Sequence, residues 1–153
     1  MIEPVHGEGL FIPMPRDFPP RLREVCDRHG ILYVDDEVQS GVGRTGPMWA
    51  IEHYGVEPDL LVSGKSLGGG LPLSACAGRP EVMQRWPASR GEALHTSTHL
   101  GNPLACAAGL TVLRVLERDS LLERAEKVGA RWLTELRSRL ASSPRVREVR
   151  GLG

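Results

Sequence analysis

Short apolar runs that end in polar residues or glycine constrain the fold of this chain most. Residues 31–36 (ILYVDD) and 59–63 (DLLVS) are rich in branched and aromatic side chains, so each run predicts a short buried strand. Residues 73–78 (LSACAG) predict a third strand. Strands that are apolar on both faces and alternate with helices indicate an α/β fold, in which helices flank a parallel-rich sheet. Apolar spacing and the positions of proline and glycine predict the helices at 18–29, 80–86, 103–117 and 121–141.

The ends of these helices are marked by residues that favour such positions. Asp17 is expected to cap the first helix and Gly30 to end it. Asn102 and Pro103 are expected to start the third helix, and Asp119-Ser120 to cap the fourth. Beyond the last helix, residues 145–149 (RVREV) predict the start of another strand.

The composition excludes several classes of protein. The 153 residues suffice for one domain with a core, and a formal net charge of zero gives no field that would attract nucleic acid or an anionic membrane. No apolar run has the length of a membrane-spanning helix, and the N-terminus lacks the features of a secretion signal. The three cysteines are far apart and the five histidines form no ligand pattern, which argues against disulfides and against a metal site. A reducing cytoplasm is therefore the predicted location.

Chemically active residues follow two of the predicted strands. Asp35, Asp36 and Glu37 stand at the end of the first strand, and Lys65 stands just beyond the end of the second. In sheets of this kind, ligands bind at the carboxyl ends of the strands. We therefore expect these side chains to meet at one edge of the sheet.

Two glycine-rich stretches invite phosphate-binding interpretations, and both fail on position. GKS at 64–66 matches the end of a P-loop, but Asp59 stands where that motif needs a glycine, and the glycines follow the lysine instead of preceding it. GVGRTG at 41–46 has the letters of a dinucleotide-binding fingerprint. The acidic stretch DDEVQS separates it from its strand, whereas the true motif follows its strand directly. A loop with unusual backbone angles explains these glycines better.

Lys65 and Asp36 suit a cofactor that is bound covalently, pyridoxal phosphate. This cofactor needs a lysine that forms an imine, a carboxylate that keeps the ring nitrogen protonated, an apolar group on the ring face and donors for the phosphate. In an extended segment Asp36 and Val38 point the same way, so one can reach the nitrogen while the other covers the ring, and Gln39 is available for the phenolic oxygen. The stretch 95–103 offers hydroxyl and backbone N–H groups for the phosphate just before a helix.

The lysine content supports a chemical role for Lys65. Lysine and arginine total 19, and because only Lys65 and Lys127 are lysines, 17 are arginines. Arginine can bind a phosphate, but it cannot deprotonate and attack a carbonyl. Burial of Lys65 against its strand is expected to depress its pKa and to make it a better nucleophile.

Four stretches, in this order and spacing, carry a resemblance to a known family. The chain resembles the class III, fold-type I, pyridoxal-phosphate-dependent aminotransferases, which include the ornithine, acetylornithine and 4-aminobutyrate aminotransferases. The resemblance covers essentially the whole chain. It implies that residues 1–118 belong to the cofactor-binding large domain, and that 119–153 form a connecting helix and the beginning of the small C-terminal domain. The stretches are EPVHGEG (3–9), LYVDDEVQSGVGRTG (32–46), PDLLVSGKSLGGGLPLSA (58–75) and HTSTHLGNPLACAA (95–108).

The resemblance implies roles for four residues at the cofactor. Lys65 corresponds to the lysine that forms the Schiff base and then shuttles the proton. Asp36 corresponds to the partner of the pyridinium nitrogen, Val38 to the residue that stacks on the ring, and Gln39 to the contact of the phenolic oxygen.

Three more residues acquire roles from the resemblance. Thr98 resembles the threonine that reaches the phosphate of the neighbouring subunit's cofactor, which implies a homodimer. Glu8 resembles the glutamate that pairs with an arginine to switch between two substrates, and Glu3 resembles a glutamate near the ring. His6 stands where the family often has glutamine.

The implied activity is transfer of an amino group from an amino acid or ω-amine to a 2-oxo acid. Epimerases and aminomutases of the same family share these motifs and remain an alternative, and a nicotinamide-binding protein is a more distant one. Because family members are more than twice as long, we expect an internal fragment that exposes strand edges and apolar helix faces and that folds poorly by itself. A non-catalytic partner that dimerises with a complete copy is therefore a further alternative.

Overall fold

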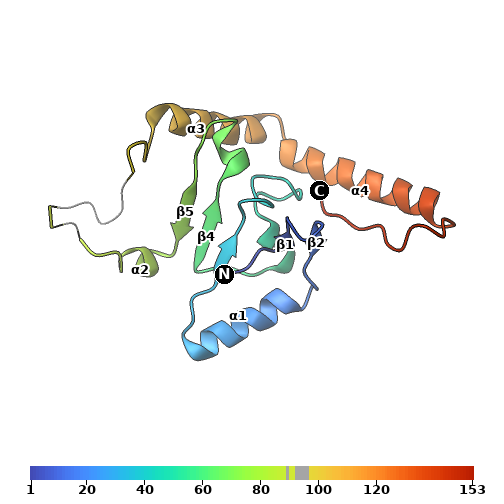
Figure 1. Cartoon of the computed structure of the whole chain (residues 1–153), viewed down its shortest axis with the longest axis horizontal. Coiled ribbons are helices and arrows are strands. Elements are labelled where there is room, and N and C mark those ends of the chain that lie inside the picture. The colour runs from blue at the N-terminus through green and yellow to red at the C-terminus, as the bar shows by residue number, and fades with distance from the viewer. Residues whose placement is uncertain (89, 92–96) are drawn as a thin grey trace.

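A three-stranded mixed sheet forms the centre of the molecule in a computed structural model that describes residues 1–88, 90–91 and 97–153 (Figure 1). The strand order is β3 (Val34–Asp36), β4 (Leu60–Ser63) and β5 (Ala75–Gly78). β3 and β4 are parallel, whereas β5 runs antiparallel to β4. The expectation of parallel strands is therefore wrong for β5. The short segment between β4 and β5 cannot make the long crossover that a parallel pair requires.

The N-terminal residues extend this sheet on the side of β3. The Ile2 N–H donates to the Val34 carbonyl at 2.9 Å, and the Asp36 N–H donates to the Ile2 carbonyl at 2.8 Å. Residues further on form a small antiparallel pair, β1 (Val5–His6) with β2 (Ile12–Pro13). This pair holds the EPVHGEG stretch beside the carboxyl end of β3.

The predicted helices are confirmed in kind, and their bounds agree within one residue except for the helix expected over 80–86, which ends at Met83. Gly30, at φ 62°, ends the first helix as expected. The Asn102 side chain accepts hydrogen bonds from two backbone N–H groups of the third helix, which confirms its capping role. The helices are α1 (Phe18–His29), α2 (Pro80–Met83), α3 (Pro103–Arg118) and α4 (Leu121–Leu140), with single 3₁₀ turns η1 (Ala50–Tyr54) and η2 (Lys65–Gly68).

Two other predicted caps are wrong. Asp17 has helical backbone angles and its side chain makes no cap hydrogen bond, because its carboxylate pairs with Arg21 at 3.2 Å. Ser120 adopts a left-handed conformation at φ 48° and its side chain caps nothing. A left-handed residue turns the chain sharply between α3 and α4, which is incompatible with the extended backbone of a capping residue.

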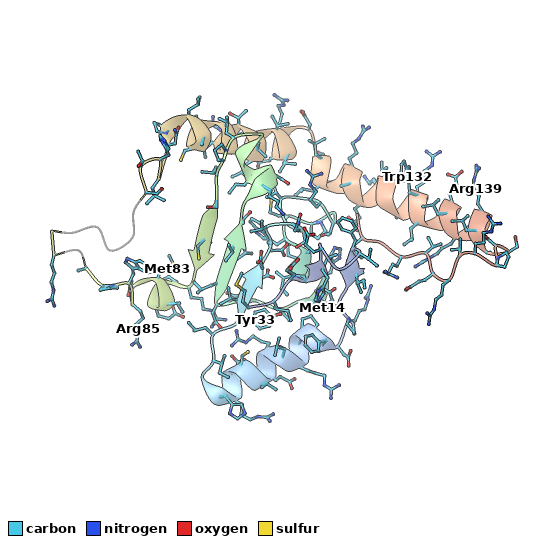
Figure 2. The ribbon with its side chains drawn as sticks, in the orientation of Figure 1. Met14, Tyr33, Met83, Arg85, Trp132 and Arg139 are labelled. Atoms are coloured by element: carbon cyan, nitrogen blue, oxygen red, sulfur yellow. The ribbon has the colours of Figure 1, made fainter. Side chains whose placement is uncertain are left out.

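The core lies between α1 and the sheet. Cys26 of α1, Tyr33 before β3 and Ile51 of η1 are buried together, and Figure 2 shows Tyr33 between the sheet and α1. An ion-pair group closes the same region, because Asp59 accepts hydrogen bonds from the Arg23 guanidinium at 2.6 Å and from the Tyr33 N–H at 2.7 Å. This packing fixes the start of β4 relative to β3.

Large apolar surfaces remain exposed, as the sequence led us to expect. α4 projects away from the sheet and has no buried residue, and its Trp132 is 66% exposed (Figures 1 and 2). All four residues of β5 are exposed as well. The predicted strand at 145–149 is absent. These residues return beside α4, where Arg137 Nε donates to the Val149 carbonyl, and they have no strand partner among the described residues.

Within the described ranges, no helix combines the length and the apolar character that crossing a membrane would require.

Candidate functional site

The carboxyl ends of β3 and β4 meet at one edge of the sheet, as predicted. The expectation that the Asp35 and Glu37 side chains also lie at this edge is wrong, because both are buried on the opposite face of the strand. Asp36 lies opposite Val62 in the parallel register, and the Glu37 N–H continues the pairing to the Val62 carbonyl at 2.8 Å. Val38 Cγ1 lies 3.8 Å from the point where a Cβ on Gly64 would stand. The side chain of Val38 therefore lies beside the backbone that leads into Lys65.

Lys65 opens the turn η2 in a conformation that non-glycine residues rarely adopt. Its φ of 42° places it in the left-handed region, and strained backbone of this kind is common at functional sites. Its side chain is exposed, so the expectation that Lys65 is buried against the strand is wrong. The lysine lies beyond the strand, and the buried residues of its turn are Leu67 and Gly68. No hydrogen bond or ion pair within the described part of the chain engages its amine.

Close packing against α3 holds this turn in place. A Cβ on Gly109 of α3 would stand 3.1 Å from the Leu67 carbonyl oxygen and 2.6 Å from Leu73 Cδ2. Gly69, at φ 60°, comes equally close to Val112, since its Cβ would lie 2.9 Å from Cγ2. Glycines on both sides therefore let the helix press on the turn that carries Lys65.

The N-terminal glutamates lie beside the residues that follow β3. Glu8 Oε1 accepts a hydrogen bond from Gln39 Nε2 at 3.2 Å, which brings together two residues predicted for the site. Glu3 Oε2 accepts one from the Gly7 N–H at 3.0 Å, so Glu3 holds the turn that presents Glu8. Asp36 is half-buried, and its Oδ1 accepts from the Val38 N–H at 3.1 Å.

A cleft of about 830 Å³ opens between Lys65, residues 71–74 and the loop before α3. Ser97 and His99 line this cleft, whereas Thr98 lies in the same loop, is exposed and is not part of the lining. Two N–H groups at the start of α3, those of Leu104 and Ala105, already donate to Asn102 Oδ1. These two groups are thus unavailable to a phosphate, and the predicted contributions of His95 and Thr96 lie outside the described residues.

A pair of buried carboxyls behind the site was not predicted. Asp35 is 0% exposed and Glu37 is 1% exposed, on the face of the strand opposite Asp36. Burial raises the pKa of Asp35 to about 8, and the negative charge of Glu37 adds to this effect. Neither Asp35 oxygen has a hydrogen-bond partner among the described residues. Glu37 therefore raises the pKa of Asp35 through the repulsion of its negative charge and not through a hydrogen bond. The sequence signal was present, since three acids in a row on a buried strand must place at least one inside.

Burial also raises the pKa of Glu37, but hydrogen bonds oppose the shift. Glu37 Oε2 accepts from the Ser40 hydroxyl at 2.6 Å, and Oε1 accepts from the Ile51 N–H at 2.8 Å. Glu37 is thus the better hydrogen-bonded of the two buried carboxyls and the one that can carry a negative charge.

Pyridoxal phosphate fits the donor set of this edge. A half-buried carboxylate (Asp36) and an apolar side chain (Val38) lie at the carboxyl end of β3, a primary amine (Lys65) follows the neighbouring end of β4, and Gln39 adds an amide. These are the groups that would hold the ring nitrogen, the ring face, the aldehyde carbon and the phenolic oxygen. The described residues contain no group of three or more His, Cys, Asp or Glu side chains that could hold a metal ion.

Comparison with known proteins agrees with this arrangement. The family model of the class-III aminotransferases matches residues 1–153, and the chain belongs to this family. Class-III aminotransferases are pyridoxal phosphate enzymes. The α/β fold is likewise shared with solved structures of this family. The ornithine aminotransferase from Toxoplasma gondii superposes with a TM-score of 0.89 at 41% identity, over 99% of this chain and 35% of that one. The active site of that enzyme holds pyridoxal phosphate at partial occupancy.

Among curated proteins, similarity extends to more than one reaction type. The 5-aminovalerate aminotransferase DavT of Pseudomonas putida is 46% identical over 100% of this chain and 35% of its own length. A leucine/methionine racemase of Thermococcus litoralis is 43% identical over 99% of this chain and 33% of its own length. The chain thus spans about a third of the length of the curated relatives it matches.

Proposed function

We propose that the full-length protein is a pyridoxal-phosphate-dependent aminotransferase that moves an amino group from an amino acid or ω-amine to a 2-oxo acid. The observation that carries this proposal is that Asp36, Val38 and Lys65 follow the adjacent carboxyl ends of β3 and β4, at one edge of the sheet. Membership of the class-III aminotransferases supports it.

When bound, pyridoxal phosphate supplies a conjugated ring that delocalises the electron pair left when a proton leaves the substrate carbon. The Lys65 amine would hold the cofactor covalently and, once displaced by the substrate amine, its Nζ would carry the proton between carbon atoms. Asp36 would keep the ring nitrogen protonated, which needs an ionised carboxylate within hydrogen-bond reach. Val38 would press on the ring face, and Gln39, itself held by Glu8, would donate to the phenolic oxygen.

The assembly and location follow as further parts of the proposal. A homodimer would explain why Thr98 is exposed and outside the cleft that Lys65 lines, because this residue would then serve the partner's cofactor phosphate. The division into a large domain over 1–118 and a small domain that starts at 119 places the boundary between α3 and α4. The three free cysteines suit a reducing cytoplasm.

Chemical trapping at Lys65 tests the proposal. Borohydride reduction of the cofactor-loaded protein should attach the cofactor permanently to the Lys65 peptide, which is thereby labelled. Lys65→Arg should abolish this labelling and should lower turnover by about a thousandfold or more. Lys127 offers a matched control. It is exposed and pairs with Glu123 at 3.2 Å, so Lys127→Arg should keep wild-type labelling and rate. Labelling at Lys127, or full turnover by Lys65→Arg, would refute the assignment.

A second candidate is an amino-acid epimerase, which the similarity to the leucine/methionine racemase favours. The same Lys65 would serve, since removal and return of one proton at the α-carbon also requires a base beside the ring. Incubation of a single L-amino acid with no 2-oxo acid separates the two reactions. Formation of the D-isomer under these conditions supports the epimerase, whereas product that depends on an added 2-oxo acid supports the aminotransferase.

A further inference from the structure

The buried residue Glu37 makes hydrogen bonds to three segments behind the site, which are β4, the residues that follow β3, and η1. Its backbone N–H donates to the Val62 carbonyl of β4 at 2.8 Å, and its carbonyl accepts from the Gly41 N–H at 3.0 Å. Its side chain accepts from the Ser40 hydroxyl at 2.6 Å and from the Ile51 N–H of η1 at 2.8 Å. All four bonds surround the turn over residues 37–41, which carries Val38 and Gln39.

The turn has little room to adopt another conformation. A Cβ on Gly41 would stand 2.7 Å from the Glu37 carbonyl oxygen and 2.9 Å from Trp49 Cε3. Gly7 closes the other side, because its Cβ would stand 2.7 Å from Gln39 Cγ. Loss of the Glu37 acceptors would leave a buried Ile51 N–H and a buried Ser40 hydroxyl without partners, and the turn would relax to find them elsewhere.

We propose that Glu37 is a positioning residue, which acts through the turn over residues 37–41 to hold Val38 and Gln39 in place for the cofactor. The consequence for cofactor binding rests on the proposed function, whereas the rigidity of the turn does not. Glu37 faces away from Asp36 and touches neither cofactor nor substrate. Its contribution is two acceptor oxygens at fixed places on the far side of the strand.

Substitutions of matched size separate the acceptor role from simple packing. Glu37→Met keeps roughly the volume of the side chain and removes both acceptors. Glu37→Gln can still accept from Ile51 and can donate to the Ser40 hydroxyl, so it should restore the turn. Ser40→Ala removes one of the two bonds and should have an intermediate effect. Tyr54→Phe is the stability control, because it removes hydrogen bonds to the carbonyls of Pro4 and Met14 outside the turn.

Backbone hydrogen exchange of the cofactor-free full-length protein is the primary measurement. Glu37→Met should speed exchange at Ile51 by about tenfold, the effect of losing a buried hydrogen bond to a charged acceptor, and should also speed exchange at Gly41, because the turn that holds the Gly41 N–H against the Glu37 carbonyl relaxes. Glu37→Gln and Tyr54→Phe should stay within about threefold of wild type at these amides. Equilibrium dialysis with pyridoxal phosphate is the second measurement, and the dissociation constant should rise by about tenfold in Glu37→Met and stay near wild type in Glu37→Gln.

Each outcome bears on one of the two claims. Unchanged exchange in Glu37→Met, or equal acceleration in Glu37→Met and Glu37→Gln, would overturn the positioning role. If Glu37→Met does not fold, Ser40→Ala decides, because exchange at 38–41 must then exceed that of Tyr54→Phe. Wild-type protein that binds no pyridoxal phosphate would refute the proposed function, while the exchange data would still judge the role of Glu37 in the turn.

Discussion

The buried carboxyl of Asp35 should make the free energy of unfolding depend on pH. Its carboxyl is fully buried without a partner among the described residues, and its pKa is raised from 3.8 to about 8. The folded protein therefore keeps a proton that the unfolded chain releases above pH 4. Stability must fall as the pH rises from about 4 to about 8, since over this range the folded state binds more protons.

The size of the effect follows from the same shift. Each pH unit between the two pKa values costs 1.36 kcal/mol, and pH 7 lies about three units above the unfolded value, so the cost at pH 7 is about 4 kcal/mol. Asp35→Asn is neutral at every pH and nearly equal in volume. We expect its free energy of unfolding to match the wild type near pH 4 and to exceed it by up to about 4 kcal/mol at pH 7.

Denaturant unfolding of the full-length protein at a series of pH values between 4 and 8 measures this difference. The charged or titratable groups that face Asp35 are Glu37, Asp36 and Tyr33, and they are the same in both proteins. Glu24→Gln, a substitution of an exposed acid on α1, should leave the difference unchanged. Parallel stability curves for wild type and Asp35→Asn would refute the reasoning, because they would mean that Asp35 is ionised in the folded state.

Two more substitutions test the packing that supports the site. Asp59→Asn should destabilise the protein by about 1–3 kcal/mol, because it removes the charge that pairs with Arg23 and Arg79. Burial opposes ionisation of Asp59, but the hydrogen bond from Arg23 holds the pKa of Asp59 below its usual value. The wild type should therefore have the higher free energy of unfolding above pH 4, and this difference should disappear as the pH falls further. A difference that persists in acid would contradict this. Gly109→Val should cost about 1–3 kcal/mol and slow borohydride trapping at Lys65, because the new side chain would press on the lysine turn. Ala107→Val, on the exposed side of α3, should show only the small propensity cost and normal trapping. Because Gly→Val itself improves helix propensity, a Gly109→Val protein as stable as the wild type and trapped at the wild-type rate would contradict the packing argument.

The order and kind of the elements could be predicted from the sequence because local signals specify them. Gly30 ends α1 and Asn102 caps α3 through bonds to their own neighbours, so four residues of context suffice. Ser120 and Asp17 failed as caps for two different reasons. Ser120 sits in a left-handed turn that the meeting of α3 and α4 imposes, and Asp17 pairs with Arg21. Tertiary or side-chain competition overrode the local preference.

The sequence by itself determined which residues lie at the carboxyl ends of β3 and β4. Parallel pairing of two apolar strands brings the residues after them to one edge of the sheet, so the placement of Asp36, Val38 and Lys65 there could be predicted, while their roles at a cofactor stay predictions. Only the tertiary structure decided what surrounds them, because burial depends on residues distant along the chain. It placed Lys65 on an exposed left-handed turn under α3, and it buried Asp35 and Glu37 behind the strand, where low polarity sets their proton affinity.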